Sequence, residues 1–232
     1  MIPAGGNSGS NEAGPIRNGE LDLAGFVLAG GRSSRMGADK ALLSFAGKPL
    51  IAHALQILLR AGLSASIAGA QSSLESFAPV VPDAQPDRGP LGGICAALAS
   101  TNADYSVFLS VDQPLLPVSL VKYLLHHARI TGRAVTLASI NGYAQSFPAV
   151  VKRSVLAVLE AELQSGRGGC YSAFQAAGSN LQEPVSVVAV EMLVQAGQVA
   201  HPERLPAVRW FANLNRPADL ERAMRNRLNS IG

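Results

Sequence analysis

Short apolar runs alternate with longer stretches of helical periodicity from Leu23 onward, and this order restricts the fold more than any other feature of the chain. The run AGFVLAG at 24–30 is apolar at successive positions, as in a central parallel strand that is covered on both faces. The stretch PLIAHALQILLRAG at 49–62 places apolar residues at helical spacing, with a proline at its start and Gly62 at its end. Strand, helix and strand in sequence favour a parallel sheet with right-handed crossovers.

The same alternation continues toward the C-terminus. The further ranges predicted as strands are 65–70, 78–83, 105–112, 134–139, 147–152 and the segment that begins at 185. The further ranges predicted as helices are 90–100, 117–132, 154–166 and 217–228. We therefore expect an α/β fold: a single three-layer domain with a mainly parallel, Rossmann-like twisted sheet and a smaller mixed part beyond Ala134.

The N-terminal segment differs in composition from the rest of the chain. Residues 1–22 are rich in glycine, asparagine and serine and lack the basic start and apolar stretch of a signal peptide. We interpret 1–22 as a disordered leader and 23–232 as one domain. In the whole chain 48% of the residues are hydrophobic and 15% are charged, which suffices for a sizeable core.

Composition also bears on location and partners. Cys95 and Cys170 have no metal-ligand spacing, which fits a reduced, cytoplasmic protein. No apolar run approaches the roughly 20 residues that span a bilayer, so we expect no membrane association. The net charge is +3 without a dense run of lysine and arginine, which disfavours a nucleic-acid partner.

Polar and glycine residues follow the first predicted strand, at the position where parallel sheets bind ligands. Ala29, Gly30 and Gly31 leave room for backbone N–H groups to approach phosphates. Arg35 and Lys40 follow, and such cations neutralise a departing pyrophosphate. The segment is neither a P-loop nor a GxGxxG fingerprint.

The strand predicted at 105–112 ends in a carboxylate, Asp112. Magnesium prefers one or two carboxylates together with phosphate oxygens, so a single aspartate at this edge suits a Mg²⁺ ion that accompanies a nucleotide. No histidine and no carboxylate pair stands out in the sequence as a general base.

The segment LAGGRSSRMGADKALLSFAGKPL at 28–50 resembles the nucleotidyltransferase signature LAGGxSxRMGxDKxLxxxxGxPL. Its doubled glycine is similar to that of the molybdenum cofactor guanylyltransferase family. Weaker similarities follow in PDRGPLGGICAAL, SVDQPLLP and FANLNRPADL, so the resemblance extends from Leu28 to Leu220. It implies the nucleotide-diphospho-sugar transferase type of fold and Mg²⁺-dependent transfer of GMP from GTP to the molybdopterin cofactor, with release of pyrophosphate.

The resemblance also implies roles for particular residues. Those that would contact the nucleotide are Leu28, Ala29, Gly30, Gly31, Arg35, Lys40, Asp83 and Asp112. Among them, Arg35, Lys40 and Asp112 would serve catalysis, with Asp112 holding the metal and Asp83 lying near the guanosine. Asn213 and Asn215 would shape the acceptor pocket, although asparagines before Pro217 also suit a turn. Transient contacts with proteins that supply or receive the cofactor are expected.

Two departures from the family pattern keep other functions open. Gly69 stands where the guanylyltransferases tend to have an asparagine, and Ser146-Phe147 stands where a histidine is usual. The first alternative is therefore a cytidylyltransferase that acts on the same pterin or on a small phosphorylated alcohol. The second is a nucleotide-binding module without turnover, which the presence of both Lys40 and Asp112 disfavours.

Overall fold

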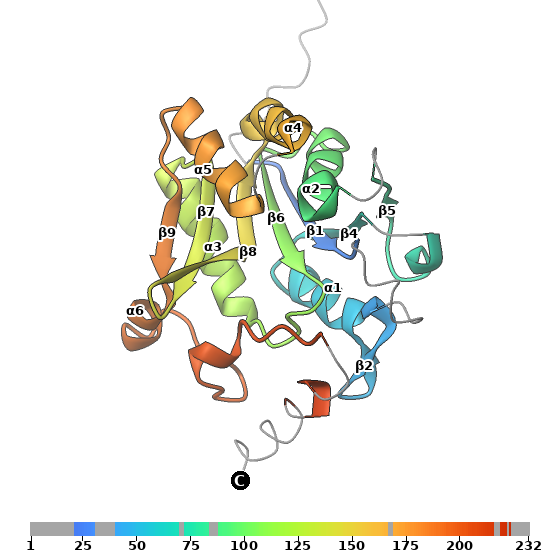
Figure 1. Cartoon of the computed structure of the whole chain (residues 1–232). Helices are drawn as coiled ribbons and strands as arrows, with labels where there is room; N and C mark the ends of the chain where they lie inside the picture. The colour runs from blue at the N-terminus through green and yellow to red at the C-terminus, as the bar shows by residue number, and fades with distance from the viewer. Residues whose placement is uncertain are drawn as a thin grey trace, which may run out of the picture.

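A seven-stranded sheet forms the centre of the molecule, with helices on both of its faces (Figure 1). The computed structural model describes residues 21–30, 40–69, 72–83, 88–166, 169–215, 219–221 and 223. The expected α/β fold with a mainly parallel sheet is confirmed, and solved structures with the same fold are reported below. No helix in the described part of the chain is long and apolar enough to cross a membrane.

The elements alternate as the apolar pattern predicts. The strands are β1 (Leu23–Leu28), β2 (Ser44–Phe45), β3 (Lys48–Pro49), β4 (Ser64–Ala68), β5 (Val80–Val81), β6 (Tyr105–Ser110), β7 (Val135–Ile140), β8 (Tyr143–Lys152) and β9 (Ser186–Ala189). The helices are α1 (Leu50–Arg60), α2 (Gly89–Ala99), α3 (Val118–Thr131), α4 (Leu156–Ser165), α5 (Cys170–Asn180) and α6 (Val190–Gln195).

The order of strands in the sheet is β5-β4-β1-β6-β8-β7-β9. β1 lies at the centre of the parallel half and pairs in parallel with both β4 and β6. β8 is antiparallel to β6 and β7, while β9 is parallel to β7. The sheet is therefore parallel where the first strands lie and mixed beyond β6, which matches the division expected at Ala134.

Two apolar clusters fill the spaces between the sheet and its helices. One face of the sheet packs against α1, α3 and α6, and the other packs against α2, α4 and α5. Val27 and Phe26 are neighbours in β1 but belong to different clusters, because successive side chains of a strand point to opposite faces. Because both faces of β1 are covered by helices, the strand is apolar throughout. The sheet with helices on each face forms a three-layer architecture.

Several elements differ from the sequence expectation. β8 begins at Tyr143, four residues before the predicted strand, because it forms a tight hairpin with β7 through Asn141 and Gly142. The hairpin of β2 and β3 was not predicted, since each strand has only two residues. α5 was not predicted either, although its buried residues, Cys170, Ala173, Phe174 and Ala177, recur at helical spacing. The predicted helix at 217–228 falls mostly outside the described residues.

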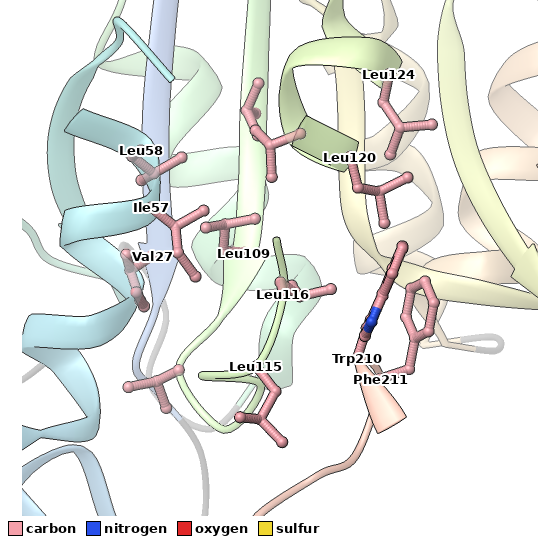
Figure 2. Close-up of a cluster of buried hydrophobic side chains, with 14 of the residues drawn as sticks. Val27, Ile57, Leu58, Leu109, Leu115, Leu116, Leu120, Leu124, Trp210 and Phe211 are labelled. Carbon is pink, nitrogen blue, oxygen red and sulfur yellow. The ribbon is translucent and has the colours of Figure 1, made fainter. Parts of the chain in front are cut away.

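A C-terminal segment completes the cluster on the α1 and α3 face. Figure 2 shows Trp210 and Phe211 beside Leu116 and Leu120, which come from the start of α3 and the loop before it. Trp210 is 1% exposed, and its indole N–H donates a hydrogen bond of 2.8 Å to the Leu205 carbonyl oxygen. The segment that follows it is therefore held firmly against the domain.

We expect Trp210→Ala to lower the free energy of unfolding by about 3–5 kcal/mol, because removing a buried aromatic side chain leaves a cavity and an unpaired carbonyl. Urea denaturation of the two proteins measures this difference. Leu59→Ala is the control: Leu59 is 61% exposed, so its loss should change the stability by less than about 0.5 kcal/mol. Equal effects of the two substitutions would show that Trp210 does not anchor this segment.

Candidate functional site

Parallel pairing of β1 and β6 brings two sequence-predicted segments to one edge of the sheet. Leu28 lies opposite Ser110, and the Val111 N–H donates a hydrogen bond of 3.2 Å to the Leu28 carbonyl oxygen. On the other side of β1, the Ala29 N–H donates to the Ala68 carbonyl oxygen at 3.1 Å. The glycine-containing loop after β1 therefore starts between the carboxyl ends of β4 and β6, where ligands of such sheets bind.

Lys40 and Asp112 are in direct contact. Lys40 begins a short 3₁₀-helix, Lys40–Leu42, and its Nζ lies 2.7 Å from Asp112 Oδ2. The two side chains are 19% and 15% exposed, so the ion pair is largely shielded but open to a ligand. Seventy-two positions separate the two residues in the sequence, and the sheet brings them together.

The two asparagines predicted for the acceptor pocket join the same cluster. Asn215 Oδ1 accepts a hydrogen bond from Lys40 Nζ, and Asn213 Oδ1 accepts one of 3.1 Å from Gln113 Nε2. Between them, the Leu214 N–H donates to the backbone carbonyl oxygen of Asp112 at 2.9 Å. The segment after Trp210 thus returns to the end of β6 and closes one side of the site.

A turn at the end of β6 presents the Asp112 carboxylate. The Gln113 N–H donates a 3.3 Å hydrogen bond to the Ser110 carbonyl oxygen, and the Ser110 hydroxyl donates one of 2.5 Å to Asp112 Oδ1. Gln113 is 6% exposed and Ser110 is half-buried. Neither residue was predicted to belong to the site, although both lie within two positions of Asp112 in SVDQP.

Asp83 lies in a second part of the edge, after β5. A Cβ on Gly69 would meet Asp83 Oδ1 at 3.1 Å, and one on Gly93 would meet the same oxygen at 3.5 Å. Oδ1 is buried without a hydrogen-bond partner among the described residues, and burial raises the pKa of this carboxyl above its ordinary value. A Cβ on Gly30 would lie 2.1 Å from the Gly69 carbonyl oxygen, so only glycine fits there.

The sheet order sets the spacing of these groups. Asp83 follows β5 and Asp112 follows β6, with β4 and β1 between them. At the usual separation of strands, the ends of β5 and β6 lie about 14 Å apart along the edge. The Asp83 carboxylate packs against Gly69, which follows β4. The structure therefore brings Lys40, Asp112, Asn213 and Asn215 together and places Asp83 outside this cluster. Gly31 and Arg35 lie outside the described residues.

The donor set suits one kind of metal ion. Among the described residues, no three histidine, cysteine, aspartate or glutamate side chains gather into a possible metal cluster. Asp112 is a single, partly exposed carboxylate. Zinc and calcium sites need more protein ligands than this, whereas Mg²⁺ is commonly held by one or two carboxylates with phosphate oxygens and water. Asp112 thus fits a Mg²⁺ ion that arrives with a nucleotide.

The chain is similar to known nucleotidyltransferases. A family model described as "MobA-like NTP transferase domain" matches residues 25–182. A relative from Haloferax mediterranei, named "Probable molybdenum cofactor guanylyltransferase", is 30% identical over 223 residues, which are 91% of this chain and 97% of the relative.

Solved structures show the same fold. "Molybdopterin-guanine dinucleotide biosynthesis protein A" from Archaeoglobus fulgidus superposes with a TM-score of 0.69 at 21% identity, covering 89% of this chain and 99% of that one. The 2-C-methyl-D-erythritol 4-phosphate cytidylyltransferase from Thermus thermophilus has a TM-score of 0.60 at 14% identity, with 89% and 98% covered. This chain therefore shares its fold with both proteins.

The raised pKa of Asp83 predicts a pH-dependent cost to stability. The folded state holds the proton of this carboxyl more tightly than the unfolded state does, so stability is lost as the pH rises through the raised pKa. We expect Asp83→Asn to be more stable than the wild type at pH 7, with a difference that shrinks as the pH falls and Asp83 becomes neutral.

Urea denaturation of both proteins at several pH values between 7 and 4 measures this difference. Glu75→Gln, which removes a solvent-exposed carboxylate, is the control for the loss of one charge. An Asp83→Asn protein that is no more stable than the wild type at pH 7 would contradict the prediction.

Proposed function

Because the chain belongs to the MobA-like NTP transferase family, we propose that it transfers GMP from GTP to the molybdopterin cofactor and releases pyrophosphate. The contact of Lys40 with Asp112 carries this proposal. It joins, at one point of the sheet edge, a cation for the phosphates and a carboxylate for a divalent ion. A nucleotide-binding module without turnover would not need this pair.

The reaction is an in-line displacement at the α-phosphorus of GTP. An oxygen of the acceptor's terminal phosphate forms a bond to this phosphorus, while the bond to the oxygen that bridges to the β-phosphate breaks. The backbone of Gly30 would contact the triphosphate, whereas the Ala29 N–H is already bonded to the Ala68 carbonyl oxygen, and Lys40 would offset the charge of the departing pyrophosphate. The acceptor oxygen is already anionic, so the protein supplies no base and acts by positioning the two phosphates.

Dependence on Mg²⁺ is part of the proposal. Asp112 would hold the ion through its carboxylate, which is partly exposed and lies at the end of β6. When bound, Mg²⁺ withdraws electron density from the phosphate oxygens and makes the phosphorus more electrophilic. Lys40 would leave Asp112 for the phosphates when the nucleotide binds, because a polyphosphate offers it a greater negative charge than one carboxylate does, and Asp112 would then be free to hold the ion.

Asp83 is proposed to recognise the base. Its buried Oδ1 lacks a partner among the described residues, and it packs so close to Gly69 and Gly93 that a Cβ on either residue would contact it. Guanine carries donors at N1 and N2 that one carboxylate accepts together, whereas cytosine offers the N4 amino group alone. Gly69, which lacks the amide usual in the family, leaves this recognition to Asp83 and keeps a cytidylyltransferase as the alternative function.

Asn213 and Asn215 are proposed to bind the acceptor. Each lies next to Leu214, which is hydrogen-bonded to Asp112, and Asn215 contacts Lys40, so both side chains would lie near the reacting phosphates. Contacts with proteins that deliver or receive the cofactor, and a location in the cytoplasm, stay predictions of the sequence.

We expect Lys40→Ala to lower kcat/KM for pyrophosphate release by about 10²–10³-fold, because the transition state loses its cationic partner. A coupled pyrophosphate assay with GTP, the molybdopterin cofactor and Mg²⁺ measures the rate. Lys48→Ala is the matched control: this exposed lysine lines a separate cavity of about 370 Å³ beside α1. Unchanged turnover in Lys40→Ala would reject the assigned role.

We expect GTP with Mg²⁺ to raise the melting temperature more than CTP does at the same concentration. Saturation at a hundred times the dissociation constant stabilises a protein by about 2.7 kcal/mol, which a thermal shift assay detects readily. Asp83→Ala should reduce the difference between the two nucleotides. A larger shift with CTP in the wild type would favour the cytidylyltransferase.

A further inference from the structure

We propose that Ser110 is a positioning residue that binds one oxygen of the Asp112 carboxylate, so that only the other oxygen binds a cation. The proposal rests on the proposed function, since it concerns the metal aspartate of that reaction. In the proposed reaction Ser110 does not contact the nucleotide. It acts through Asp112.

The turn at 110–113 sets this geometry. Ser110 is the last residue of β6, and its backbone carbonyl accepts the hydrogen bond that closes the turn from Gln113. Its hydroxyl donates to Asp112 Oδ1 at 2.5 Å, two residues along the chain. The carbonyl of Asp112 is held by Leu214 at 2.9 Å. Backbone and side chain of Asp112 are therefore both fixed, and the carboxylate has a defined plane.

The two oxygens of Asp112 consequently differ in role. Oδ1 receives the serine hydroxyl, and Oδ2 receives Lys40 Nζ at 2.7 Å. A charge-assisted hydrogen bond to Oδ1 draws charge from that oxygen and leaves Oδ2 as the site for a cation. In the protein without nucleotide, Lys40 is that cation. When a triphosphate draws Lys40 away, Oδ2 becomes free for the divalent ion.

A carboxylate that offers one oxygen discriminates between metal ions. Mg²⁺ requires near-octahedral geometry and accepts a single carboxylate oxygen readily, whereas Ca²⁺ is larger and tolerates both oxygens of one carboxylate. Without the Ser110 hydroxyl, the carboxylate rotates more freely and offers both oxygens. Loss of this group should therefore weaken Mg²⁺ binding and leave Ca²⁺ binding nearly unchanged.

The test measures metal affinity without turnover. The full-length protein is loaded with a GTP analogue that has a methylene group between the α- and β-phosphorus, and Mg²⁺ or Ca²⁺ is titrated by calorimetry. Ser110→Ala should raise the Kd for Mg²⁺ about tenfold, as removal of an outer hydrogen bond to a metal ligand does, with less than a twofold change for Ca²⁺. Asp112→Ala, which removes the protein ligand, gives the affinity of ions that the nucleotide alone holds.

Two further variants separate positioning from folding. Ser110→Thr keeps the hydroxyl and should retain the Mg²⁺ affinity, while Ser110→Cys keeps the shape, donates only weakly and should lose it. Melting temperatures of all variants report folding. Equal losses for Mg²⁺ and Ca²⁺, or wild-type Mg²⁺ affinity in both Ser110→Ala and Ser110→Cys, would overturn the proposal.

A separate measurement, pyrophosphate release by the wild type, tests the proposed function. A wild-type protein that releases no pyrophosphate from GTP and the molybdopterin cofactor would reject the function, whatever the metal titrations give. Turnover in the wild type together with unchanged Mg²⁺ affinity in the Ser110 variants would reject only the role of Ser110.

Discussion

Parallel pairing of β1 with β6 holds the site together. It puts Leu28 opposite Ser110, so that the loop after the first strand and the turn after the sixth leave the sheet at the same edge. The hydrogen bond from the Val111 N–H to the Leu28 carbonyl extends this pairing one step beyond the strands. A shift of one residue in the register would turn every side chain of one strand to the opposite face and separate the two loops.

Close packing on both faces of the sheet keeps these strands in register. Alternate residues of β1 enter two different apolar clusters, so the strand cannot slide without exposing one of them. Trp210 anchors the returning segment in the first cluster, and Leu214 then hydrogen-bonds the carbonyl of Asp112. Only a few residues separate the buried Trp210 from Leu214. This short connection holds the asparagines on either side of Leu214 beside the ion pair of Lys40 and Asp112.

Asp83 and Asp112 lie at different positions along the same edge of the sheet, so the candidate site is elongated. Asp83 and Asp112 follow strands that have two others between them, and the glycines after β1 and β4 lie in the intervening space. A nucleotide laid along this edge places its base and its phosphates in different surroundings. In the proposed reaction, the base would meet a half-buried carboxylate that has an unpaired oxygen among the described residues, and the phosphates would meet Lys40 and the ion that Asp112 would hold. One sheet therefore separates recognition from chemistry.

Local patterns in the sequence were sufficient to identify most elements and the chemistry of the loops. Apolar runs at strand or helix period, together with proline and glycine at the ends of elements, are local properties, and they predicted β1, β6, α1 and α3 closely. Two-residue strands and the small-residue helix α5 carried too weak a local signal. The alternation of strands and helices placed the loops after β1 and β6 at one edge of the sheet, but which side chains touch there follows from the tertiary fold. Lys40 lies 72 positions from Asp112 and 175 from Asn215, and no periodicity relates residues so far apart. Sheet order and packing bring them together, because pairing between strands depends on the burial of whole faces and not on neighbouring residues.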